Sequence, residues 1–330
     1  MRRLFALIAL LPMAPAIAAI DLPAPLEIRA TRFSESIGNG DRIGKIRVLS
    51  LLELPTIEIG ALRFAQLSGL AWDDDDEVLY AISDKGALFH LRPQFSGSEI
   101  TSLQLLRAVP LQGYRVREPV TGLWSDAEGL DIRDGRNGRK GDAELVVSFE
   151  HHPRIVGYRP DGYALREYPL PPPLDKRKAY RNGNRMLESV CIDPKLGILT
   201  VPESPLEGEP EGTTRIFGVS GRVWRYTPAL GRISAMECLG DGTVLLLERE
   251  FGNLIRRNAV MLRRAQLAVE PSPSVPVAAE TLATLDLSDG LAIDNFEGLA
   301  RHRGNRYFMV SDDNDLFVQR TLLMYFEIID

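Results

Sequence analysis

Acidic residues recur at the two ends of one short sequence pattern, and their type and spacing could support metal chemistry. A glutamate precedes a short apolar stretch at Glu128, Glu188, Glu237 and Glu297. A second acid follows the next apolar stretch. Carboxylate oxygens in such numbers suit hard cations, and calcium best. The candidate metal ligands are Asp84, Glu128, Glu150, Glu188, Glu203, Glu250, Glu297 and Asp312.

Cationic and imidazole side chains lie beside the second set of acids in the sequence. Lys85 follows Asp84, Arg249 precedes Glu250, and His151-His152-Pro153-Arg154 follows Glu150. A metal that polarises an ester, together with cations that hold the developing negative charge, is what hydrolysis of a phosphate ester requires. A surface pair in a turn closed by Pro153 is the alternative for the two histidines. We take Glu150, His151 and Glu203 as catalytic candidates, and Lys85, Arg154 and Arg249 as substrate-binding candidates.

Several other catalytic motifs are absent from the sequence. It contains no Gly-x-Ser-x-Gly elbow of the α/β-hydrolase type. It also contains no glycine-rich phosphate loop and no paired-cysteine motif. The acids are therefore the main candidates for chemistry.

The acids belong to a repeated hairpin, which must position them. One copy is Asp294-Asn-Phe-Glu-Gly-Leu-Ala300 with the apolar stretch 306–312, and further copies surround Glu128, Glu188 and Glu237. Leu67-Ser-Gly-Leu-Ala-Trp72 is a degenerate copy with Ser68 in the place of the acid. Successive copies begin about 50 to 60 residues apart, and a period near this size is typical of β-propeller blades.

The repeat predicts an all-β fold, a β-propeller with six blades. Five hairpins are visible, and at about 50 residues per blade the chain has room for a sixth. The apolar C-terminal stretch 322–329 would pair with strands near the N-terminus to complete the sixth blade and close the ring. A β-sandwich or two smaller β domains is the alternative, but neither explains why one hairpin recurs.

Hairpin geometry predicts that both sets of acids gather at one mouth of the central channel. The start of the first strand and the end of the second lie at the same end of an antiparallel sheet. The innermost strand of each blade lines the channel. Carboxylates this close together need compensation. A bound cation, paired Arg and Lys side chains, or backbone N–H groups in a structural girdle between blades are the alternatives.

The N-terminus has the pattern of a signal peptide, which we assign to residues 1–19. Met1-Arg-Arg3 is positively charged, residues 4–11 are apolar, and Ala16-Ile-Ala18 offers small residues at cleavage spacing. The apolar stretch is too short for a membrane anchor, the alternative reading. We therefore expect residues 20–330 to form one domain of a periplasmic or secreted protein, without stable membrane insertion after cleavage.

Composition and cysteine content narrow the class further. The chain has 330 residues, 45% of them hydrophobic, and a net charge of -6, which argues against nucleic acid as a partner. We expect a monomer that binds a small molecule. Cys191 and Cys238 could form a disulfide or remain two buried thiols. Their different offsets from Glu188 and Glu237 favour thiols.

The repeated motifs resemble a known family. The Glu-Gly-Leu repeats, Leu67-Ser-Gly-Leu-Ala-Trp72, Asp294-Asn-Phe-Glu-Gly-Leu-Ala300 and the Ser-Asp-Asp-Asn run at 311–314 are similar to exported bacterial phytase-like domain proteins, the "esterase-like activity of phytase" family. The resemblance covers nearly all of the chain after residue 19. It implies a propeller related to the β-propeller phytases, which hydrolyse phosphate esters with calcium at the channel mouth. The chain lacks their Asp-Ala-Ala-Asp-Asp-Pro-Ala type motif, so no catalytic residue is carried over by motif.

Two hypotheses of different class follow. The first is a calcium-binding propeller hydrolase that acts on an ester or phosphate ester at the acidic mouth; a lactonase-type propeller is a variant of it. The second is a non-catalytic propeller that binds a ligand or a protein, with the acids as a structural girdle.

Overall fold

The computed structural model describes residues 22–183, 185–250, 258–272, 274–316 and 319–329. The predicted signal peptide lies outside these residues. Within them, no helix has the length and apolar character needed to cross a membrane.

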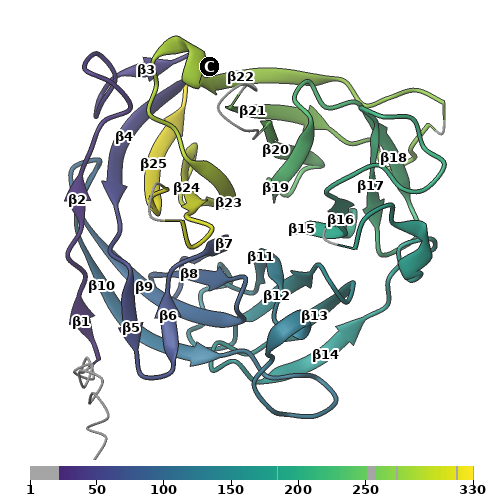
Figure 1. The fold of residues 1–330 in the computed structure, drawn as a ribbon, viewed down its shortest axis with the longest axis horizontal. Helices are drawn as coiled ribbons and strands as arrows, with labels where there is room; N and C mark the ends of the chain where they lie inside the picture. Colours follow the sequence, from purple (N-terminus) through teal and green to yellow (C-terminus); the bar gives the residue numbers. More distant parts are fainter. Residues whose placement is uncertain (1–21, 184, 251–257, 273, 317–318, 330) are drawn as a thin grey trace, which may run out of the picture.

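The described chain forms a β-propeller of five blades arranged around a common axis (Figure 1). Every neighbouring pair of strands is antiparallel, and the first strand of each four-strand repeat is innermost. From the axis outward, the first blade consists of β7 (Leu67–Asp73), β8 (Val78–Ser83), β9 (Ala87–Ser96), β10 (Glu99–Pro110) and β1 (Ala24–Pro25). The second blade consists of β11 (Ala127–Arg133), β12 (Glu144–Phe149), β13 (Arg154–Tyr158) and β14 (Ala164–Tyr168), and the third of β15 (Leu187–Asp193), β16 (Gly197–Pro202), β17 (Thr214–Gly218) and β18 (Val223–Tyr226). The fourth blade consists of β19 (Arg232–Cys238), β20 (Thr243–Glu250), β21 (Ala259–Gln266) and β22 (Ala279–Asp286), and the fifth of β23 (Asn295–Arg301), β24 (Arg306–Asp312), β25 (Leu322–Ile328), β4 (Ile46–Glu53) and β2 (Arg29–Ala30).

Short elements complete the fold. A separate hairpin precedes the first blade, one short strand pairs with β4, and three single-turn 3₁₀ helices lie in connections between blades. These elements are β5 (Ile57–Ile59), β6 (Leu62–Phe64), β3 (Arg42–Ile43), η1 (Gly122–Trp124), η2 (Arg177–Ala179) and η3 (Leu287–Asp289).

The prediction of six blades is wrong, and the strand pairing shows why. The C-terminal strand β25 does pair with β4 from near the N-terminus, with Met324 opposite Leu51. This pairing completes the fifth blade, whose inner strands are β23 and β24, and forms no additional blade. Long connections between blades raise the number of residues per blade, so the estimate of about 50 residues was too small. That the pairing closes the ring remains a prediction.

The hydrophobic core is divided among the interfaces between blades. It forms five clusters of buried side chains, each drawn mainly from two neighbouring blades. One cluster joins the last blade to the first, with Phe308 and Leu323 packed among side chains such as Leu70 and Phe89. Both faces of most strands are therefore buried, and every residue of strands such as β8 and β12 is buried.

A bulge repeats in the inner strand of every blade and sets the position of the acids. The pairing of the two inner strands shifts by one residue at Ser68, Glu128, Glu188, Ser234 and Glu297. The residue after each bulge is small, since the inner strands approach one another closely there: a Cβ added at Gly129 would lie 2.6 Å from the amide nitrogen of Val190. The space enclosed by the inner strands beside the bulges is only about 10 Å³. Side chains and backbone therefore fill nearly all of the space along the central axis beside these bulges.

Candidate functional site

The bulges correct the predicted position of the fourth acid. In the fourth blade the bulge falls at Ser234, so Ser234 and not Glu237 corresponds to Glu128, Glu188 and Glu297. Glu237 lies three residues further along β19, toward the other end of the inner strand. There its buried carboxyl has a pKa well above the usual range because of burial and the nearby Asp131. Glu237 does not join the other acids.

The same register corrects the second set of acids. The inner-strand residue just before each bulge pairs with Ser83, Phe149, Pro202, Glu248 and Ser311 in the five blades. The residues that follow these partners are Asp84, Glu150, Glu203, Arg249 and Asp312. Arg249 therefore takes the place that we predicted for an acid in the fourth blade. Glu250 lies one residue further along β20 and is exposed. Of the predicted metal ligands, it is the one placed outside the cluster.

Arg249 is the counter-ion of one half of the acid cluster. Its buried guanidinium donates hydrogen bonds to Glu297, to Glu188 at 3.1 Å and to Glu203 at 3.3 Å. Burial acts to lower the pKa of Arg249, but the surrounding carboxylates together outweigh it and raise that pKa. A second arginine contributes as well, since Arg232 Nη1 lies 2.9 Å from Glu203 Oε1. This half of the cluster already contains the positive charge that it needs.

The other half has far less compensation. No hydrogen bond or ion pair reaches the Glu128 carboxylate from the described residues, and burial with the neighbouring Glu188 and Glu297 raises its pKa well above the usual range. Asp84 has one buried carboxylate oxygen, Oδ1, without a hydrogen-bond partner. Its other oxygen contacts Lys85 Nζ at 2.9 Å, and Lys85 is largely exposed. Burial and the neighbouring Glu297 raise the pKa of Asp312 to about 8.

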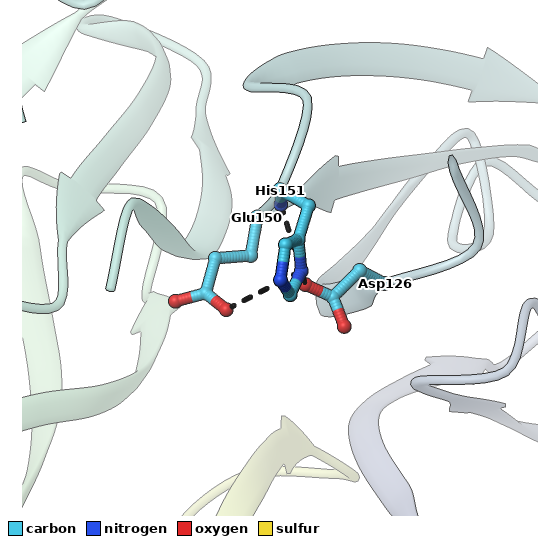
Figure 2. A group of neighbouring side chains, drawn as sticks. All are labelled: Asp126, Glu150 and His151. Atoms are coloured by element: carbon cyan, nitrogen blue, oxygen red, sulfur yellow. Dashed lines mark hydrogen bonds and ion pairs between the residues drawn. The ribbon is translucent and has the colours of Figure 1, made fainter. Parts of the chain in front are cut away.

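A histidine lies between two carboxylates at the edge of this half (Figure 2). His151 Nδ1 hydrogen bonds to the Asp126 carboxylate and lies 4.0 Å from Glu150 Oε2. The turn after β12 holds the group together, since the Glu150 amide donates to the Asp126 carbonyl at 2.9 Å. Burial, together with Asp126 and Glu203, raises the pKa of Glu150 to about 8. Such a group can position a histidine and move a proton.

Asp126 is the residue that the sequence reasoning left out of the site. It stands outside the hairpin repeat, two residues before Glu128, and carries no repeated signal of its own. Its proximity to Glu128 in the chain was the one available hint. The structure brings Asp126, Glu150 and His151 together, with one ligand atom from each within 4.8 Å of the others, and it does the same for Glu150, Glu188 and Glu203.

The predicted substrate-binding cations are placed differently from one another. Lys85 is exposed beside Asp84, whereas Arg249 is engaged by carboxylates. Arg154 lies over the ring of Phe149, 3.7 Å from its centroid, and donates to the carbonyls of His152 and Trp124. Burial lowers its pKa to about 10. Arg154 therefore supports the turn that carries the two histidines.

The two cysteines form a disulfide, so the favoured interpretation as free thiols is wrong. Cys191 on β15 and Cys238 on β19 are bonded, with their Cα atoms 5.5 Å apart. The prediction compared the positions of the two cysteines along their strands by counting residues from Glu188 and from Glu237. Counted from the true bulge at Ser234, Cys238 is four residues along its strand and Cys191 is three residues from Glu188. The bond links the inner strands of the third and fourth blades.

The carboxylates on the side away from Arg249 have the donor type of a hard divalent cation, although the ligand atoms that lie within 4.8 Å of one another come from Asp126, Glu150 and His151 and from Glu150, Glu188 and Glu203. Asp84, Glu128, Glu150 and Asp312 offer only oxygen ligands, which is what calcium prefers. Asp84 Oδ1 has no hydrogen-bond partner, and burial together with neighbouring carboxylates raises the pKa values of the other three carboxyls. Glu188, Glu203 and Glu297 are less suited, because Arg249 is already bound among them.

The comparison with family models decides the relationship. A model described as "Phytase-like: Esterase-like activity of phytase" matches residues 62–315. The chain belongs to this phytase-like family. The search of curated proteins gave no match. The predicted family is confirmed, and the match spans all five inner hairpins.

Three solved structures are similar to this phytase-like chain at 10–11% sequence identity. A putative gluconolactonase is 10% identical, covers 92% of this chain and 87% of its own, and has a TM-score of 0.43. The Cps50 (Swd1) β-propeller domain of Myceliophteria thermophila is 10% identical, with 92% and 99% covered and a TM-score of 0.40. The WD40 repeats of RRP9 are 11% identical, with 92% and 87% covered and a TM-score of 0.41.

Proposed function

We propose that this phytase-like propeller is an exported, calcium-dependent hydrolase that acts on esters or phosphate esters at its acidic mouth. The observation that carries the proposal is the division of the acid cluster. Arg249 neutralises one half. In the other half, beside the Asp126–His151 pair, Glu128 has no ion pair among the described residues and Asp84 is paired only with the largely exposed Lys85. A cation and a proton acceptor would then lie next to each other.

The residues have distinct roles in this mechanism. Asp84, Glu128, Glu150 and Asp312 would hold calcium, which when bound polarises the oxygen of the ester group and offsets the carboxylate charge. Asp126 accepts the hydrogen bond from His151 Nδ1 and so leaves Nε2 able to take a proton. His151 removes a proton from water as the water oxygen attacks the carbonyl carbon or the phosphorus. The C–O or P–O bond then breaks, and the leaving alkoxide takes the proton back from His151.

Export is supported by the disulfide and by the N-terminal sequence. Cysteine pairs such as Cys191–Cys238 persist in oxidising compartments, which include the bacterial periplasm and the extracellular space. The signal-peptide pattern at residues 1–19 agrees with such a location. We propose a periplasmic or secreted monomer.

The proposal is tested by metal dependence and by one conservative substitution. Calcium at about 100 times its Kd should raise the melting temperature by about 5 °C, and a chelator should abolish turnover of 4-nitrophenyl butyrate and 4-nitrophenyl phosphate. Asp126→Asn should lower kcat by about 10²-fold or more, because it removes the acceptor that orients His151. Asp289→Asn, an exposed carboxylate at η3, is the matched control and should leave kcat unchanged. Full activity in the presence of chelator, or in Asp126→Asn, would overturn the mechanism.

A non-catalytic propeller is the second candidate, and Arg249 favours it. Its ion pairs to Glu188 and Glu203 of the third blade and to Glu297 of the fifth join three neighbouring blades through the fourth, as a structural girdle would. On this reading the phytase-like protein binds a ligand without converting it. The same ester panel separates the two candidates, because the girdle alone predicts no turnover with or without calcium.

A further inference from the structure

The loop between β10 and β11 exposes apolar side chains directly beside the proposed site. Among the described residues, eight large hydrophobic side chains are exposed, and four of them lie in this loop: Tyr114, Val116, Leu123 and Trp124. The loop continues into Asp126, the residue that holds His151. Exposed apolar groups concentrated in one place are typical of a binding surface.

This loop forms one wall of a pocket of about 520 Å³. The opposite wall is the turn from His151 to Arg154, and residues 174–177 contribute a third side. The volume lies within the roughly 300–1,000 Å³ of small-molecule sites. Because His151 belongs both to the pocket lining and to the Asp126–Glu150 group, a molecule in the pocket would lie next to the proposed proton acceptor.

The pocket offers a flat apolar surface. Trp124 is 55% exposed, and its indole stacks on the His152 ring with the centroids 3.9 Å apart and the planes inclined by 12°. Arg154 lies 5.4 Å from the centre of the same indole and donates to the Trp124 carbonyl. Trp124 is therefore held in place, and Val116 lines the same pocket with 70% of its surface exposed.

The arginines and the acidic side chains that line the pocket are equal in number. Three arginines line it, and three carboxylates, Glu118, Glu167 and Asp175, line it as well. The arginines also have partners: Arg177 donates to the His151 carbonyl at 3.0 Å, and Arg115 lies 3.9 Å from Glu167. A polyanion would face this balanced lining and the acidic mouth beside it, whereas an uncharged apolar group would cover Trp124 and Val116.

We infer that this pocket binds the apolar part of the substrate, an aromatic ring or a short acyl chain, while the ester bond lies at His151. The inference rests on the proposed function and narrows its substrate class. Uncharged monoesters with an apolar group are preferred to polyanionic phosphate esters such as inositol hexakisphosphate.

Tryptophan fluorescence measures occupancy of the pocket without any turnover. The chain has three tryptophans, and Trp72 and Trp224 are buried at 3% and 2% exposure, so Trp124 is the exposed reporter. Titration with benzyl alcohol, the alcohol product of a benzyl ester, should shift the emission to shorter wavelength and saturate. Val116→Ser should weaken this binding by about three- to tenfold, because it removes apolar surface from the pocket wall. Leu287→Ser, which is 47% exposed and lies outside the pocket, is the matched control and should bind as the unaltered protein does.

Kinetics of the same variants test the substrate class. Val116→Ser should lower kcat/KM for 4-nitrophenyl butyrate by a similar factor, and Leu287→Ser should leave it nearly unchanged. No saturable emission shift, or equal shifts in Val116→Ser and the unaltered protein, would overturn the inference even if esters were hydrolysed. A saturable shift that Val116→Ser weakens, found without any ester turnover, would support the pocket and overturn the proposed hydrolase.

Discussion

At the scale of single residues, one substitution within a repeated pattern gives the acidic mouth two unlike halves. Four blades place an acid at the end of the second strand, and the fourth blade has Arg249 at the equivalent position. A buried guanidinium among three carboxylates removes the need for a metal on that side. On the other side, Glu128 has no ion pair among the described residues, and Asp84 keeps one buried oxygen without a hydrogen-bond partner. In the proposed mechanism, the position of one arginine thus decides which half of the mouth binds the metal ion.

Replacement of this arginine should be strongly destabilising. Arg249→Met keeps much of the side-chain volume but leaves Glu188, Glu203 and Glu297 without their common counter-ion. Loss of one partner from a buried ionic group costs about 3–5 kcal/mol. Urea unfolding of the calcium-free protein should show this loss. Arg29→Met is the control: this arginine is 72% exposed in its pair with Glu53, so its removal should leave stability nearly unchanged. Equal stability of the two variants would show that Arg249 is not the counter-ion.

At the scale of elements, the hairpin could be predicted from the sequence and the bulge could not. The apolar strands and acidic ends of the repeat gave the five inner hairpins and their common end. The bulge depends on close packing of neighbouring inner strands, and in the fourth blade its residue is Ser234, which no acid marks. Ser234-Ala235-Met236 does match Ser68-Gly69-Leu70 of the first repeat, with a small residue after the bulge in both. That small residue, required by the packing, was the signal that the acids obscured. Asp126 was missed for a related reason, because its place in the site depends on a turn outside the repeat.

Close packing of the inner strands should make Gly129 intolerant of any side chain. A Cβ at this position would lie 2.6 Å from the Val190 amide nitrogen and 2.7 Å from Ser189 Cα, both backbone atoms of the next blade. Gly129→Ala should therefore lower the free energy of unfolding by about 1–3 kcal/mol, the usual cost of overpacking. At Gly231 the nearest atom would be 3.7 Å away, so Gly231→Ala is the matched control and should be close to neutral. Urea unfolding compares the two, and a neutral Gly129→Ala would mean that the blades can separate slightly at the bulge.

At the scale of the whole molecule, the chain is joined by contacts between segments far apart in sequence. β4 lies outside β25 in the fifth blade, and the disulfide links the third blade to the fourth. The apolar character of the stretches 46–53 and 322–328 made both strands predictable. Their membership of the fifth blade was not predictable, because sequence period alone does not state how many residues the connections use. β4, which comes early in the chain, is therefore part of the last blade.

If the pairing of β4 with β25 closes the ring, damage to β4 should destabilise every blade together. Leu51 is fully buried, faces Met324 in the pairing and packs in the cluster shared by the fourth and fifth blades. Leu51→Ala should lower the free energy of unfolding by about 2–5 kcal/mol. Trp72 and Trp224, in the first and third blades, would report the same shifted midpoint as far-UV circular dichroism, since a closed ring unfolds as one unit. Leu287→Ala, at an exposed position, controls for loss of a leucine side chain. A tryptophan transition that keeps its original midpoint, while part of the circular dichroism signal is lost earlier, would show that the fifth blade unfolds separately and that the pairing does not close the ring.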